Sequence, residues 1–168
     1  MVRFEGGLLV ERAVATIRSG GCAPVVVVLG ASAAEVRAAA DLGDATTVEN
    51  PDWRTGMGSS LRVGLAALAD TKADAALVVL VDMPGITAEA VRRLAVLADP
   101  AALAMAGYGP RRSHPVLLGR QHWPGVAMLA TGDVGARPYL TAHAANVRVI
   151  PCDDVADDAD LDVPPAQA

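Results

Sequence analysis

Two stretches of the chain are apolar without interruption and show no helical periodicity. Residues 24–29 end at Gly30, and residues 76–81 end at Asp82. Short β-branched runs of this kind are typical of strands that are covered on both faces of a parallel sheet. The pattern therefore predicts two buried strands, and shorter strands are expected over residues 46–48, 102–106, 115–118 and 147–150.

Amphipathic segments separate these strands. Ser32 and Glu35 have the spacing of a capping box and predict the start of a helix, and Thr87 predicts another start. The expected helices cover residues 8–18, 58–69, 121–129 and 136–143, together with the two that follow Ser32 and Thr87. Alternating strands and helices indicate an α/β fold, in which a mostly parallel, doubly wound sheet has helices on both faces.

Composition narrows the class of protein. The 168 residues suit one domain, and 52% apolar against 20% charged residues excludes wholesale disorder. We expect this domain to cover residues 1–152, followed by an acidic segment, 153–168, that either closes a metal site or is disordered. The net charge of −5 argues against nucleic acids and anionic membranes as partners. No apolar run approaches the roughly 20 residues that span a bilayer, and the two separated cysteines fit a cytoplasmic protein.

Asp82 is the first candidate for chemistry. It follows a predicted central strand, and ligands of open α/β sheets bind beyond the carboxyl ends of such strands. A carboxylate there is placed to bind Mg²⁺. The alternative is that Asp82 caps the turn that it makes with Pro84.

A glycine- and serine-rich cluster, residues 56–62, is the second candidate. Glycines permit close approach of a ligand, and Ser59 or Ser60 would begin a helix whose N-terminus attracts anions. The alternative is an ordinary loop followed by a helix cap.

Three further polar residues form the third group of candidates. Asp133 would cap the helix that follows it, and Arg137 carries a guanidinium suited to phosphate. His114 precedes a strand, but no serine or cysteine motif marks it as the base of a nucleophile. A surface role for Arg137 and a structural role for His114 remain open.

Taken in order along the chain, these clusters resemble a known family. The stretch 48–65, VENPDWRTGMGSSLRVGL, is similar to the signature of molybdenum cofactor cytidylyltransferases, which are MobA-like nucleotidyltransferases. Four further segments resemble motifs of the same enzymes: LVDMP at 80–84, SHPVL at 113–117, GDVGAR at 132–137 and DLDVP at 160–164. The resemblance extends from about Arg3 to Pro164.

The resemblance implies a Rossmann-like, GT-A-like nucleotidyltransferase fold. It implies transfer of CMP from CTP to molybdopterin, with release of pyrophosphate, and a molybdenum hydroxylase or its chaperone as a further partner. Asp82 and Asp162 would be the catalytic carboxylates that hold Mg²⁺. Nucleotide binding would fall to Gly58, Ser59, Ser60 and Arg62, and substrate binding to His114, Asp133 and Arg137. Relatives that transfer guanylyl groups carry Gly-Pro-Leu-Ala-Gly here, so Ser-Ser-Leu-Arg favours cytidine.

One departure from the family is large. The family begins with a strand and a glycine-rich loop, LAAGxSxRMGxxK, whose amides and lysine hold the triphosphate, and neither is present. We therefore expect the first, central strand to be missing, which leaves the 24–29 and 76–81 strands each without a ladder partner. The closing motif also differs, with Val163 in place of threonine. Whether the chain is an enzyme thus stays open: the alternatives are a non-catalytic accessory protein for molybdenum enzymes and a relative with another base or acceptor.

Overall fold

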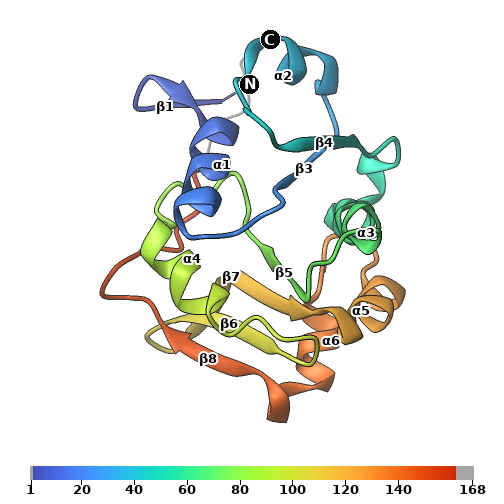
Figure 1. The fold of residues 1–168 in the computed structure, drawn as a ribbon, viewed down its shortest axis with the longest axis vertical. Coiled ribbons are helices and arrows are strands. Elements are labelled where there is room, and N and C mark those ends of the chain that lie inside the picture. Colours follow the sequence, from blue (N-terminus) through green and yellow to red (C-terminus); the bar gives the residue numbers. More distant parts are fainter. Residues whose placement is uncertain (1, 162–168) are drawn as a thin grey trace.

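Two layers of helices enclose a layer of strands (Figure 1). On one face lie α1 (Leu9–Ser19) and α4 (Ala88–Ala95), which contact each other, and on the other lie α3 (Met57–Ala69) and α5 (Trp123–Leu129). The computed structural model describes residues 2–161. The expected α/β fold with helices on both faces is confirmed.

The strands form three separate groups. The largest is a four-stranded sheet in the order β5-β7-β6-β8, made of β5 (Ala75–Val78), β7 (Arg111–Gly119), β6 (Leu103–Tyr108) and β8 (Arg148–Pro151). The others are a parallel pair, β3 (Val26–Leu29) with β4 (Thr46–Glu49), and a small hairpin of β1 (Arg3–Phe4) with β2 (Gly7–Leu8).

The large sheet is mixed, because β7 runs antiparallel to both of its neighbours. Gly109 and Pro110 separate β6 from β7, and Gly109 has φ +59. A two-residue turn with a left-handed residue returns the chain directly onto the preceding strand. The hairpin therefore extends well beyond the two short strands that the sequence predicts here.

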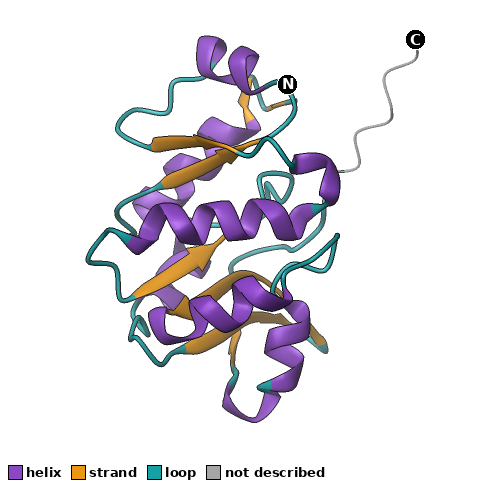
Figure 2. Cartoon of the chain, turned by 90° about the vertical axis from the view of Figure 1, so that its right-hand side faces the viewer, coloured by secondary structure: helices purple, strands orange, loops and turns teal. Residues whose placement is uncertain are grey.

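β3 and β5 each pair along one edge only within residues 2–161. Thr46 and Asn50 donate to the carbonyls of Val25 and Leu29, so the peptide groups of Val26 and Val28 face away from β4. The Arg120 N–H donates to the Asp74 carbonyl at 2.8 Å, so by the same alternation Ala75 and Leu77 turn their peptide groups away from β7. The expected loss of a ladder partner by both strands is confirmed, and in Figure 2 α3 lies in front of the interval between them.

The remaining helices match the predicted positions, with one correction. α2 (Ala33–Ala39) follows Ser32, but Ser32 has φ +60 and its side chain makes no cap hydrogen bond, so the predicted capping box is wrong. At α4 the hydroxyl of Thr87 accepts from the Ala90 N–H, as expected. The short elements are α6 (Arg137–Ala142) and the 3-10 turns Trp53–Thr55, Arg120–His122 and Ala144–Asn146.

Apolar clusters join each helical layer to the strands. Val91 and Leu94 of α4 are fully buried against one face of the four-stranded sheet, and Leu65 of α3 and Val126 of α5 pack on the other. A third cluster joins α1 to β3 through Val14 and its neighbours. No helix in the described part of the chain is long and apolar enough to cross a membrane.

Candidate active site

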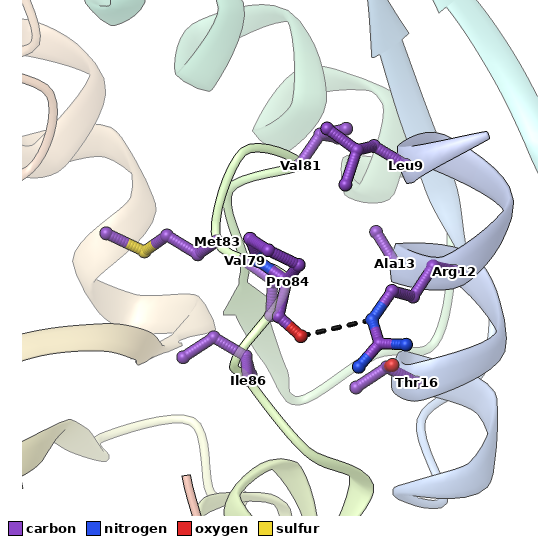
Figure 3. Close-up of a pocket in the computed structure, with 9 residues that line it drawn as sticks. All are labelled: Leu9, Arg12, Ala13, Thr16, Val79, Val81, Met83, Pro84 and Ile86. Carbon is purple, nitrogen blue, oxygen red and sulfur yellow. Dashed lines mark hydrogen bonds between the residues drawn. The ribbon is translucent and has the colours of Figure 1, made fainter. Parts of the chain in front are cut away.

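Asp82 lies in the loop that leaves β5, with its side chain exposed; the strand ends at Val78, so the prediction that it runs to residue 81, directly before Asp82, is wrong. Helix α1 supports this loop: the Arg12 guanidinium Nε donates to the Pro84 carbonyl at 3.0 Å (Figure 3). In the same view, Leu9 and Ala13 of α1 face Val79 and Val81 across a narrow space. The carboxylate is therefore presented from a loop that is anchored to the neighbouring helix.

The C-terminal segment reaches the Asp82 loop. We call residues 152–161 the strap; it leaves β8 and passes beside α4, as the red trace in Figure 1 shows. The Asp157 N–H donates to the Gly85 carbonyl at 3.1 Å, and the Leu161 N–H donates to the Asp82 carbonyl at 2.7 Å. A Cβ at Gly85 would lie 2.6 Å from the Asp157 carbonyl oxygen, so the approach requires glycine. Asp162, the second predicted carboxylate, lies outside the described residues.

His114 lies at the same end of β5. Val116 of β7 pairs with Val78, and β7 is antiparallel, so His114 precedes that pair at the carboxyl end of β5. Burial lowers the pKa of His114 to about 4, while the nearby charge of Asp160 acts to raise it and that of Arg137 to lower it. The charges of Arg137 and of Asp160 in the strap thus both act on His114, and the imidazole is neutral near pH 7.

The two glycine-containing clusters meet at the start of α3. The Gly58 N–H donates to the Gly132 carbonyl at 2.8 Å, and the Arg62 guanidinium donates to the Ala130 carbonyl. A Cβ on Gly58 would lie 2.6 Å from the Ala130 carbonyl, so Gly58 serves a close approach of two backbones. Segments 56–62 and 130–137 therefore form one unit.

Asp133 does not cap the helix that follows it. Its carboxylate Oδ1 accepts from the Met57 N–H at 3.2 Å, at the beginning of α3, whereas α6 begins at Arg137 with no side-chain cap. The prediction of a local cap is wrong because the unpaired N–H groups that Asp133 meets belong to a helix 76 residues earlier. The exposed Arg137 begins α6.

Asn50 is a central residue that sequence reasoning missed. Its side chain is 1% exposed, and its amide Nδ2 donates to the hydroxyls of Ser59 (2.7 Å) and Ser60 (3.0 Å). The single hydrogen of the Ser59 hydroxyl is shared between the carbonyls of Gly56, at 2.8 Å, and Asp52, at 3.2 Å. Ser59 is thus buried and satisfied by protein groups, while Ser60 is half-buried. The Asn-Pro-Asp turn signal was visible in the sequence, but the partners of Asn50 were not.

A cavity of about 430 Å³ opens beside Asp82. Asp82 is the one charged residue that lines it, and the rest of the lining is apolar: Val2, Leu8, Leu9, Val10, Val36, Met57, Leu80 and Val81. Cavities of this size and character commonly hold small organic ligands. The cavity, the start of α3 and the Asp82 loop meet at the carboxyl end of β5.

The donors at this end suit a hard divalent cation. Among residues 2–161 no three histidine, cysteine, aspartate or glutamate side chains converge on one point. Mg²⁺ does not need such a cluster, because it keeps several waters and is held by one or two carboxylates together with substrate phosphates. The exposed Asp82 carboxylate, with the strap tied to its loop, fits that requirement.

This chain is similar to known proteins in sequence and in fold. The model of the MobA-like NTP transferase domain matches residues 1–149. The nicotine blue oxidoreductase of Paenarthrobacter nicotinovorans is 40% identical over 169 residues, covering 96% of this chain and 82% of that protein.

Solved structures share the fold. Rv0371c from Mycobacterium tuberculosis H37Rv gives a TM-score of 0.79 at 24% identity, over 95% of this chain and 82% of that chain. The complex of Rv0371c with manganese gives 0.78 at 23% identity, over 90% and 79%. A nucleotidyl transferase from Methanothermobacter thermautotroptrophicus, Mth528, gives 0.76 at 20% identity, over 89% and 72%.

Proposed function

The chain belongs to the family of MobA-like NTP transferase domains, and from this premise we propose that it is built to transfer CMP from CTP to molybdopterin, releasing pyrophosphate. The observation that carries the proposal is the hydrogen bond from Leu161 to the carbonyl of Asp82. It ties the motif that closes the chain to the carboxyl end of β5, where ligands of α/β sheets bind.

Asp82 and Asp162 are proposed to hold Mg²⁺. Asp82 is exposed beside the cavity, and Asp162 directly follows the residue that is bonded to the Asp82 loop. The segment 153–168 would then close the metal site. When bound, Mg²⁺ neutralises charge on the phosphates that are transferred and released. The manganese complex of Rv0371c is consistent with a divalent cation in this fold.

Arg137 and His114 are proposed to face the molybdopterin phosphate in different ways. The Arg137 guanidinium is exposed and always charged, so it can bind a phosphate directly. His114, with a pKa of about 4, is neutral near pH 7 and offers a hydrogen bond but no positive charge. Asp133 supports this side indirectly, because it is bonded to the start of α3.

The first turn of α3 is proposed to contact the nucleotide. Ser60 is half-buried and lies beside the buried Ser59, and both hydroxyls are held by Asn50. Gly58 and Arg62 fix this turn against residues 130–132. A turn held so firmly can narrow the pocket and favour the smaller cytosine over guanine.

A transfer assay tests the proposal. We expect the 168-residue chain to release no pyrophosphate from CTP and molybdopterin, because it lacks the triphosphate loop and lysine. A variant extended upstream by the family's LAAGxSxRMGxxK segment should be active and prefer CTP over GTP by at least about tenfold, which requires about 1.4 kcal/mol of differential binding. Asp82→Asn in the extended variant is the inactive control, and Ser60→Pro should weaken the preference. Equal consumption of GTP and CTP would contradict the cytidine assignment.

A second candidate rests on the 40% identity to the nicotine blue oxidoreductase. That protein's name states an oxidation or reduction of nicotine blue, and the apolar cavity beside Asp82 could accept an organic substrate of this kind. The same end of the sheet would then bind a redox nucleotide in place of CTP.

The two candidates consume different co-substrates and can be separated directly. An oxidoreductase should bleach nicotine blue while oxidising a reduced nicotinamide dinucleotide in equal amount, without pyrophosphate release. A transferase should release one pyrophosphate per CTP and leave the pigment unchanged. If the 168-residue chain, supplied with the reduced nicotinamide dinucleotide and no other protein, bleaches the pigment, the second candidate replaces the first.

The cellular setting follows from the first candidate. We propose a cytoplasmic protein that passes its product to a molybdenum hydroxylase or its chaperone, and the two unpaired cysteines, Cys22 and Cys152, fit a reducing compartment. Binding of molybdopterin without any transfer by the extended variant would instead favour the accessory protein.

A further inference from the structure

Two ion pairs fasten the strap to the body of the protein. Arg93 of α4 donates to both oxygens of Asp154, at 2.6 and 2.7 Å, near the beginning of the strap. Arg111, at the start of β7, donates from Nη2 to Asp158 Oδ1 at 2.5 Å. Both pairs join an arginine to an aspartate of the strap. Asp158 lies nearer along the strap than Asp154 to Leu161, which is bonded to the Asp82 loop.

The environments of the two carboxylates differ. The side chain of Asp154 is 62% exposed, whereas that of Asp158 is 9% exposed. The hydrogen bond from Arg111 lowers the pKa of Asp158, and the hydroxyl of Ser113 contributes to a smaller extent. A nearly buried carboxylate is costly to leave without its cation, whereas the Asp154 carboxylate stays hydrated when its pair is broken, although Arg93 is 29% and Arg111 67% exposed. The Arg111–Asp158 pair is therefore the one whose loss should release the strap.

The position of this pair links it to the candidate site. Asp158 lies between the two strap residues whose N–H groups bind the Asp82 loop, Asp157 and Leu161. On the other side of the pair, Arg111 begins the strand that carries His114. Releasing Asp158 would loosen both hydrogen bonds and separate Asp160 from His114.

We propose that Arg111 and Asp158 are positioning residues, forming a latch that holds the strap on the Asp82 loop and so sets the affinity of this loop for a divalent cation. The cation-binding half of this inference rests on the proposed function, while the mechanical half concerns the strap alone. The Arg93–Asp154 pair provides the matched control, because it is also an arginine–aspartate pair on the strap.

Amide hydrogen exchange, followed by NMR, tests the mechanical half in the full 168-residue chain. In Asp158→Asn, the amides of Asp157 and Leu161 should exchange at least about tenfold faster, because their bonds to Gly85 and Asp82 open more often. Asp154→Asn should change the same two rates less than about twofold. If Asp158→Asn does not fold, Arg111→Gln breaks the same ion pair at its arginine, whose side chain is 67% exposed. Equal rates in the Asp158 and Asp154 variants would overturn the latch.

Titration with Mn²⁺, with the free ion measured by electron paramagnetic resonance, tests the other half. Asp158→Asn should weaken Mn²⁺ binding by at least about fivefold, Asp154→Asn should leave it unchanged, and Arg111→Lys should recover part of the loss. Faster exchange with unchanged Mn²⁺ affinity would overturn the role of the latch at the cation site. If the unaltered chain binds no Mn²⁺, the role of the latch at the cation site fails and the exchange rates alone decide the mechanical half, whereas the metal assignment of the proposed function, which includes substrate phosphates, is decided by the transfer assay.

Discussion

At the scale of single residues, polar groups are buried here only where a specific partner meets them. Asn50 and Ser59 are the buried polar residues of the described chain, and each is bonded to the other. No buried side-chain nitrogen or oxygen among residues 2–161 lacks a partner. The residue type alone did not reveal this, since Asn50 also fits an ordinary turn.

His114 should make the stability of the protein depend on pH. Its pKa is about 4 in the fold and 6.5 ordinarily, so between these values the unfolded chain binds a proton that the folded chain does not. The free energy of unfolding should therefore fall as the pH drops from 7 towards 4, by about 2 kcal/mol at pH 5 from this residue. Urea unfolding of the chain and of His114→Gln at several pH values measures the contribution.

The difference in unfolding free energy between the original chain and His114→Gln separates the contribution of His114 from that of the acidic residues, because the acidic residues titrate in both proteins. We expect the gap in unfolding free energy between His114→Gln and the original chain to change by about 2 kcal/mol between pH 7 and pH 5. Parallel pH profiles would show that the imidazole is protonated freely in the fold.

At the scale of elements, local patterns predicted most helices and strands, and failures occurred where a distant segment supplies the partner. The apolar runs became β3 and β5, and Thr87 caps α4 as its spacing indicated. Asp133 was assigned to the nearest helix but is bonded to α3. Which backbone segments approach each other across dozens of residues is decided by packing in three dimensions, so the spacing of residues along the sequence could not predict it.

The contact between α3 and residues 130–132 should respond sharply to added volume. Gly58→Ala places a Cβ 2.6 Å from the Ala130 backbone, which cannot move aside as a side chain can. We expect it to lower the free energy of unfolding by about 1–3 kcal/mol, as overpacking does.

Gly64→Ala is the control on the same helix. There the Cβ would meet only the Val28 side chain, at 3.2 Å, and the gain in helix propensity of up to about 1 kcal/mol works in its favour. Chemical unfolding of both variants gives the comparison. If Gly58→Ala is as stable as Gly64→Ala, the two backbones do not approach as closely as described.

At the scale of the whole molecule, the layer of strands has a gap in backbone pairing between β3 and β5, which we call the division. Helices α1 and α3 lie on its two faces, and the peptide groups of Val26, Val28, Ala75 and Leu77 turn toward the division. Composition and periodicity predicted the two strands but not the division, which followed from the resemblance to the family. The site is affected as well, because Val2 and Asp82 line the same cavity at the end of this division.

An upstream extension that carries an apolar strand and the glycine-rich loop should therefore stabilise the fold. Val2 and Asp82 line the same cavity, so an extension would enter from the carboxyl end of β5, where its loop could reach the phosphates. With a strand paired on both edges, the amides that face the division should exchange at least about tenfold more slowly, and the free energy of unfolding should rise by several kcal/mol. The control is an extension of equal length with proline in the strand, because proline cannot donate to the ladder. If both extensions leave exchange at Val26, Val28, Ala75 and Leu77 unchanged, then water satisfies these groups, and the division does not take a strand.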